Sequence, residues 1–132
     1  MPTQEDEMSK PLSILVIEDH LMQQYAIQAL LEGMGHRVTV ASDAREALNR
    51  LNQPYDLILI DLALPEGING LEVAKKIRQK GVSTWMVAIT ARTAHYSKQE
   101  CLDAKINDFI AKPMTRKKLE EITHQLNKKM NA

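Results

Sequence analysis

The chain has 132 residues, of which 44% are hydrophobic and 26% charged, and its 17 basic residues balance its 17 acidic ones. This length suits a single domain with one core. The zero net charge argues against a nucleic-acid surface, which needs a basic face. The one cysteine, Cys101, excludes an internal disulfide and fits a reducing compartment. No apolar run approaches the length of a membrane span, so we expect a cytoplasmic location without membrane insertion.

The first eleven residues are polar and lack periodicity, which predicts a flexible leader over 1–11 and a folded domain over 12–132. Short apolar runs typical of buried strands then alternate with amphipathic stretches typical of helices. The predicted strands are Leu12–Ile17, Arg37–Ala41, Asp56–Ile60, Trp85–Ile89 and Asp108–Ala111. The predicted helices cover residues 21–34, 44–51, 70–80, 95–104 and 115–130.

This alternation predicts βαβ units and a parallel sheet with helices on both faces. Right-handed crossovers leave few ways to connect five such units. We therefore expect an α/β fold, a doubly wound (βα)5 flavodoxin-like three-layer sandwich with the sheet order 2-1-3-4-5.

Three carboxylates follow two strands that this order makes neighbours. Glu18 and Asp19 come directly after the first strand, and Asp61 comes directly after the third. Carboxylates gathered at one edge of the sheet raise each other's pKa unless a cation lies among them. Their oxygens suit Mg²⁺, or Mn²⁺ in its place, better than zinc. With such an ion present, Asp61 can act as a nucleophile toward a phosphoryl donor and form an acyl phosphate.

Two further polar residues end the remaining strands. Thr90 closes the fourth strand and offers a hydroxyl, and Lys112 closes the fifth and offers a positive charge. Positioning and charge balance are what a protein supplies to phosphoryl transfer. Considered one at a time, an Asp or a Thr at the end of a strand, such as Asp61 or Thr90, usually serves only to cap a helix or turn. A lysine such as Lys112 is usually a surface residue. Their coincidence at successive strand ends favours a phosphoryl site.

This ordered set resembles the CheY-like receiver domain of response regulators in two-component systems. The matching motifs are Glu-Asp, Asp, Thr-Ala and Lys-Pro after the first, third, fourth and fifth strands, within a similarity that runs from about Leu12 to Met130. The resemblance implies that Asp61 accepts the phosphoryl group. It also implies that Asp19, Asp61 and the backbone carbonyl of Ala63 ligate Mg²⁺, while Glu18 acts largely through a metal-bound water.

By the same resemblance, Thr90 and Lys112 bind the phosphoryl oxygens, and the Lys112-Pro113 peptide bond is cis. Phe109 matches the switch aromatic, whose rotamer follows Thr90. Phosphorylation is then expected to reshape the face formed by residues 95–104, 108–111 and 115–130, a face that is also open to homodimerisation. The stretch QECLDAKINDFIAKPM is similar to receivers fused to hybrid sensor histidine kinases.

The function that the resemblance implies is phosphorelay signalling, with a histidine kinase or histidine phosphotransfer protein as donor. Such a domain catalyses its own phosphorylation and dephosphorylation and is not a free-standing metabolic enzyme. Two alternatives stay open. A degenerate receiver would dock partners without phosphorylation. An aspartyl phosphatase would usually have a second acid two residues beyond its nucleophile, where this chain has Ala63.

Three positions depart from the family pattern. The loop LALPEGING after Asp61 is one residue longer than expected, and Phe109 stands where tyrosine is common. Lys105 replaces a glycine, which predicts a left-handed residue at a cost of roughly 1 kcal/mol. Elsewhere, His36, His95 and His124 share no motif spacing and are expected at the surface.

Overall fold

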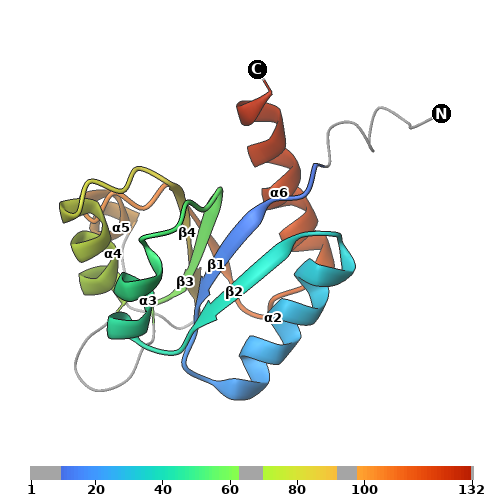
Figure 1. The fold of residues 1–132 in the computed structure, drawn as a ribbon, viewed down its shortest axis with the longest axis horizontal. Coiled ribbons are helices and arrows are strands. Elements are labelled where there is room, and N and C mark those ends of the chain that lie inside the picture. The colour runs from blue at the N-terminus through green and yellow to red at the C-terminus, as the bar shows by residue number, and fades with distance from the viewer. Residues whose placement is uncertain (1–9, 63–69, 92–97, 132) are drawn as a thin grey trace.

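The computed structural model of the chain describes residues 10–62, 70–91 and 98–131 (Figure 1). In this part of the chain, strands and helices alternate as the sequence predicts. The strands are β1 (Ser13–Ile17), β2 (Arg37–Ala41), β3 (Leu57–Asp61), β4 (Trp85–Thr90) and β5 (Asp108–Ala111). The helices are α2 (Leu21–Gly33), α3 (Ala44–Arg50), α4 (Gly70–Gln79), α5 (Lys98–Asp103) and α6 (Arg116–Met130).

The five strands form one parallel sheet in the order β2-β1-β3-β4-β5. This is the predicted doubly wound order, so the predicted fold class is confirmed. Helices α2 and α6 cover one face of the sheet, and α3, α4 and α5 cover the other (Figure 1). β1 lies between β2 and β3, so the chain adds strands first on one side of β1 and then on the other. In such sheets, ligands bind at the carboxyl ends of the strands beside this switch in direction.

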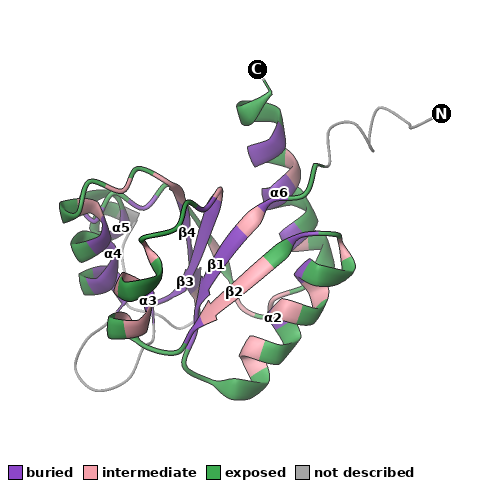
Figure 2. Ribbon diagram, in the orientation of Figure 1, coloured by how far each residue is buried: buried purple, intermediate pink, exposed green. Residues whose placement is uncertain are grey.

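The core has two halves, one on each face of the sheet. Along β1, Leu15 and Ile17 pack toward α3 and α4, whereas Ile14 and Val16 pack toward α2 and α6. Every residue of β3 is buried, as Figure 2 shows. A strand covered on both faces must be apolar throughout, which explains the uninterrupted LILI run before Asp61. The buried central strands therefore fix the positions of the polar residues at their carboxyl ends.

Local features agree with the sequence in most places. The Asp43 carboxylate accepts a hydrogen bond of 2.8 Å from the Glu46 N–H and caps α3. Lys105 has φ 60°, so its predicted left-handed conformation is confirmed, and the Lys112-Pro113 bond is cis as expected. No helix in the described ranges combines the length and apolarity needed to cross a membrane.

One prediction about a histidine is wrong. His36 is only 7% exposed, because the chain turns inward after α2 and places the ring under the start of β1. Its Nδ1 accepts a 3.0 Å hydrogen bond from the N–H of Leu12. Burial lowers the pKa of His36 below its usual 6.5. His95 lies outside the described residues.

Candidate functional site

The predicted carboxylates meet at the carboxyl ends of β1 and β3. Ile17 is paired with Ile60 in the register of these strands, so the residues that follow each strand lie side by side. Glu18, Asp19 and Asp61 each offer an oxygen within 4.8 Å of the others. Glu18 and Asp61 are buried, at 0% and 2% exposure, and Asp19 is the least buried of the three. The sheet order thus brings together the acidic residues that the sequence singled out.

Lys112 provides a positive charge at this cluster. Its Nζ lies 3.0 Å from Oδ2 of Asp61, and its own N–H donates a 2.7 Å hydrogen bond to the carbonyl of Thr90. Charge-assisted bonds of this kind are stronger than neutral ones, especially away from solvent. With all groups ionised, three carboxylates and one ammonium leave a net charge of −2, from −3 and +1. Among the groups that the structure describes, the fully ionised cluster is therefore short of positive charge, which a bound cation would supply.

Glu18 shows that shortage most directly. Its Oε1 accepts a 3.0 Å hydrogen bond from the N–H of His20, whereas its buried Oε2 has no hydrogen-bond partner among the described residues. Burial, and after it the neighbouring Asp61 carboxyl, raise the pKa of Glu18 to about 8. A buried carboxylate oxygen without a donor is costly unless a proton or a cation is bound to it.

The donor set fits a hard divalent cation. All three side chains offer oxygen, and their ligand atoms lie within 4.8 Å of one another. Mg²⁺ binds such oxygens at about 2.0 to 2.1 Å, so Glu18, Asp19 and Asp61 are near enough to one another to hold a single ion. Ala63, the expected backbone ligand, lies outside the described residues.

The two predicted switch residues lie at the other side of Asp61. Thr90 ends β4, next to β3, and its hydroxyl donates a long hydrogen bond of 3.4 Å to the carbonyl of Ile110 on β5. Phe109 is 45% exposed on the edge strand β5. Both side chains therefore face the edge of the sheet rather than the acidic cluster. A hydrogen bond this long is weak, so the Thr90 hydroxyl loses little free energy when it leaves the Ile110 carbonyl for a better acceptor.

The structure adds a residue at the site that the sequence analysis treated only as a helix start. Gly70 begins α4, where its N–H donates 3.0 Å to the carbonyl of Leu62. A Cβ at this position would lie 2.6 Å from the backbone oxygen of Asp61 and 2.6 Å from Cα of Leu62. Only glycine lets α4 approach the backbone of Asp61 so closely. The helix begins where it was predicted despite the longer preceding loop.

An apolar surface lies beside the acidic cluster. Leu21, Met22 and Tyr25, in the first turns of α2, are 55%, 70% and 61% exposed. Next to α2 is an open cavity of about 490 Å³ with mostly apolar walls. It is lined by Gln23, Ala26, Ile27, Ile89, Ala91, Lys112, Pro113 and Met114. Lys112 therefore borders both this cavity and Asp61. Exposed apolar side chains grouped in this way often mark a place where another molecule binds.

Comparison with known proteins is consistent with this geometry. Residues 14–124 match the family described as the response regulator receiver domain. The chain is 35% identical to the two-component response regulator 24 of Arabidopsis thaliana over 118 residues, which are 88% of this chain and 84% of the relative. Several other curated relatives are longer, and the chain spans half of their length or less.

Two solved structures are similar in fold and sequence. The receiver domain of the sensor histidine kinase PA1611 from Pseudomonas aeruginosa, with a magnesium ion in its active site cleft, has a TM-score of 0.79 and 33% identity, covering 90% of this chain and 99% of that one. The Saccharomyces cerevisiae complex of the histidine phosphotransfer protein Ypd1 with the receiver domain of Ssk1 has a TM-score of 0.80 and 26% identity, with 91% of each chain covered. With the family match over most of its length, the chain belongs to the response regulator receiver domains, the phosphorelay domains of two-component systems.

Proposed function

We propose that Asp61 of this chain accepts a phosphoryl group from a phosphohistidine in a Mg²⁺-dependent reaction. The observation that carries the proposal is the buried Asp61 carboxylate, with two further carboxylates within 4.8 Å and the Lys112 ammonium 3.0 Å away. A carboxylate that served only as a cap would not need this set of charges around it. The proposed domain covers residues 12–132, with 1–11 as a leader.

Glu18, Asp19 and Asp61 would hold the metal, together with the backbone carbonyl of Ala63. The unpartnered Oε2 of Glu18 and the all-oxygen donor set support this assignment, as does the magnesium ion in the PA1611 receiver. A bound Mg²⁺, or Mn²⁺ in its place, neutralises the carboxylates and binds a phosphoryl oxygen. Glu18 would act largely through a metal-bound water.

The chemistry is a transfer between two nucleophiles. An Oδ atom of Asp61 attacks phosphorus, the P–N bond to the donor histidine breaks, and the acyl phosphate keeps the transferred group. Lys112 is already beside Asp61, so its ammonium can offset the added negative charge without a large movement. Thr90 can exchange its weak bond to Ile110 for a phosphoryl oxygen. The Phe109 ring then turns inward after Thr90, because the movement of the Thr90 hydroxyl frees space beside β5.

The donor is a histidine kinase or a histidine phosphotransfer protein. The Ssk1 receiver, similar to this chain, is described in a complex with the phosphotransfer protein Ypd1. The exposed apolar residues of α2 lie close to Asp19 in the chain, where a protein that brings a histidine to Asp61 would make contact. After phosphorylation the altered face comprises α5, β5 and α6, which would bind the output partner or a second copy. A cytoplasmic location fits such a partner.

Phosphorylation by acetyl phosphate tests the proposal directly. The wild type should gain one phosphoryl group per chain by intact mass, only when Mg²⁺ is present, and Asp61→Asn should gain none. Asp103→Asn, on the exposed surface of α5, is the matched control and should be labelled like the wild type.

Two other outcomes would contradict the proposal. Repeated turnover of small phosphate esters would indicate a phosphatase. Absence of labelling in the wild type, at saturating Mg²⁺, would indicate a docking module that works without phosphorylation.

A further inference from the structure

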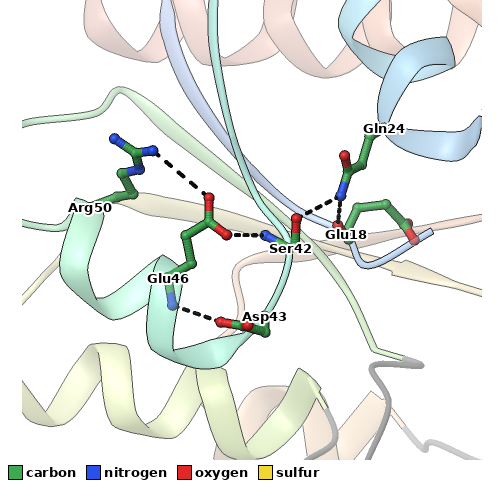
Figure 3. Close-up of polar contacts among 6 residues, drawn as sticks. All are labelled: Glu18, Gln24, Ser42, Asp43, Glu46 and Arg50. Atoms are coloured by element: carbon green, nitrogen blue, oxygen red, sulfur yellow. Dashed lines mark hydrogen bonds and ion pairs between the residues drawn. The ribbon is translucent and has the colours of Figure 1, made fainter. Parts of the chain in front are cut away.

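One side chain on α2 connects the two loops that flank the acidic cluster. Nε2 of Gln24 donates a 2.6 Å hydrogen bond to the carbonyl oxygen of Glu18 and a 3.1 Å hydrogen bond to Oγ of Ser42 (Figure 3). Glu18 begins the β1–α2 loop, and Ser42 begins the β2–α3 loop. A single amide group therefore links the loop that carries two of the proposed metal ligands to its neighbour.

The second loop is a firm anchor. The N–H of Ser42 donates 3.2 Å to Oε2 of Glu46, and the N–H of Glu46 donates 2.8 Å to Asp43. These two hydrogen bonds of Glu46 fix the start of α3, and Figure 3 shows how the network continues from Ser42 to Gln24 and Glu18. Arg50 adds an ion pair of 3.8 Å to Glu46. The position of Gln24 is thus tied to a capped helix rather than to a free loop.

The first loop has few other constraints. His20, at the N-cap of α2, makes no side-chain capping bond, and the first turn of α2 holds no acidic residue. Among the described residues, this loop also has the hydrogen bonds from the N–H of Glu18 to the carbonyl of Ala41, at 3.0 Å, from the N–H of His20 to the Glu18 side chain, and from the N–H of Gln24 to the carbonyl of His20. The carbonyl of Glu18 lies in the rigid peptide plane that joins Glu18 to Asp19. Holding that carbonyl therefore restrains the positions of the two Cα atoms from which the carboxylate side chains extend.

Electrostatic repulsion makes this restraint matter. Within 4.8 Å, the carboxylates of Asp19 and Asp61, and that of Glu18 when it is ionised, repel one another before a cation binds. If the loop were free to relax, these side chains would move apart, and ion binding would then have to bring them together again. We infer that Gln24 is a positioning residue that holds the Glu18–Asp19 pair in the geometry that accepts Mg²⁺. The inference rests on the metal site of the proposed function.

Loss of the Gln24 amide should affect the metal site more than the fold. Gln24 is half-buried, so water can replace its donor to the Glu18 carbonyl. Water satisfies that oxygen but does not tie it to Ser42. The core on this side of α2, with Ile27 and Leu31, stays intact. A purely structural role would instead show itself as lower stability without a specific change in metal binding.

The test compares Gln24→Met with Gln28→Met. Methionine keeps the length of the side chain and its helix propensity but removes the donor. Gln28 lies one turn further along the same helix and donates to the side chain of Glu32, away from the cluster. Titration calorimetry with Mg²⁺ alone should show about a five-fold higher Kd for Gln24→Met, the effect of one lost hydrogen bond. Gln28→Met should bind Mg²⁺ like the wild type, and both variants should unfold near the wild-type urea midpoint.

Two further readouts separate positioning from stability. In the metal-free protein, amide exchange of Asp19 and His20 should be faster in Gln24→Met but not in Gln28→Met. Labelling by acetyl phosphate should need more Mg²⁺ in Gln24→Met yet reach the wild-type rate at saturating Mg²⁺. Ser42→Ala should raise the Kd in the same direction, and its combination with Gln24→Met should add nothing further.

The outcomes distinguish this inference from the function on which it rests. If the wild type binds Mg²⁺ and Gln24→Met binds it equally well, Gln24 has no positioning role. If the wild type binds no Mg²⁺, the proposed metal site itself is wrong, and the inference is overturned with it.

Discussion

The Nζ atom of Lys112 lies 3.0 Å from Oδ2 of Asp61, although the two residues are 51 positions apart in the chain. Asp61 ends the buried central strand β3, and Lys112 follows the edge strand β5, so their meeting depends on β4 lying between these strands. The ammonium forms an ion pair with Asp61. Its positive charge therefore competes with a cation for Asp61 and can also offset the charge of a phosphoryl group.

Replacement of Lys112 separates these two roles. Lys112→Met removes a positive charge that competes with a cation for Asp61, so the affinity for Mg²⁺ should rise a few-fold. The rate of labelling by acetyl phosphate should fall roughly 10-fold or more, because the charge that develops on the phosphoryl oxygens loses its partner. Calorimetry and intact-mass kinetics measure the two effects. Lys75→Met, an exposed lysine on α4, is the control; a parallel fall in Mg²⁺ binding and labelling by Lys112→Met would contradict the assignment.

Glu18 should show a conflict between stability and metal binding. Its pKa of about 8 in the folded state exceeds the usual 4.5, so its burial costs nothing below pH 4.5 and a growing amount as the pH rises toward 8. Without Mg²⁺, Glu18→Gln should therefore raise the free energy of unfolding at pH 8 by about 2 kcal/mol. The same variant should bind Mg²⁺ more weakly.

Urea unfolding with a chelator at pH 8 and at pH 5 measures this effect. The gain should shrink toward pH 5, because that pH is only half a unit above the usual pKa of 4.5 and most of the cost develops between pH 5 and pH 8. A variant that is less stable than the wild type at pH 8 would show that Glu18 is not a source of strain.

The position of the acidic cluster could be predicted because it depends on strand ends alone. Carboxyl ends of parallel strands meet at one edge, so the placement of Glu18, Asp19 and Asp61 follows once the order 2-1-3 is known. The left-handed conformation of Lys105 could be predicted from the resemblance, because this lysine stands where the family pattern has a glycine. Its φ of 60° confirms that prediction.

Side chains whose partners come from distant segments could not be predicted. Gln24 bonds Ser42, 18 positions away, and His36 bonds the N–H of Leu12, 24 positions away. Neither contact leaves a periodic signal, because each depends on how two loops approach one another after the sheet has formed. The rotamers of Thr90 and Phe109 likewise depend on packing at the edge of β5. The sequence could name these two residues but not the direction in which they point.

Gly70 and Gly33 form a matched pair of helical glycines. A methyl group on Gly70 would be 2.6 Å from the Asp61 backbone oxygen, whereas one on Gly33 would meet no atom within 4 Å. Gly70→Ala should therefore destabilise the domain by about 1 to 3 kcal/mol and slow phosphorylation of Asp61. Gly33→Ala should stabilise it by about 0.5 to 1 kcal/mol. Urea unfolding of both variants measures the difference, and equal effects would show that α4 does not press on Asp61.

The exposed apolar residues of α2 should affect the rate of phosphoryl transfer from a protein donor but not from a small-molecule donor such as acetyl phosphate. Met22→Ser combined with Tyr25→Ser removes two of its exposed side chains. Transfer from a phosphorylated histidine phosphotransfer protein that phosphorylates the wild type should slow about 10-fold or more, as expected when central apolar contacts are lost. Labelling by acetyl phosphate should not change. Leu102→Ser, at an exposed apolar residue of α5, is the control, and loss of both reactions in the α2 variant would point to a damaged site instead.

His36 should make the stability of the domain depend on pH. Its pKa is lowered by burial from the usual 6.5, so the unfolded state binds a proton more readily than the folded state. The stability that His36 contributes is fully present above pH 6.5 and is lost as the pH falls below it. Protonation would also remove the Nδ1 acceptor used by the Leu12 N–H. The free energy of unfolding should thus fall, through this group, between pH 7.5 and pH 5.5.

His36→Asn isolates this contribution, because the amide oxygen of asparagine can accept from Leu12 and does not titrate. Urea unfolding at both pH values should show a smaller loss of stability in His36→Asn than in the wild type. His124→Asn should keep the wild-type dependence, since His124 is only half-buried on α6. The same pH dependence in the wild type and in His36→Asn would mean that other groups cause it. Because His36 supports the start of β1, which leads directly to Glu18 and Asp19, its protonation would weaken the strand on which the acidic cluster rests.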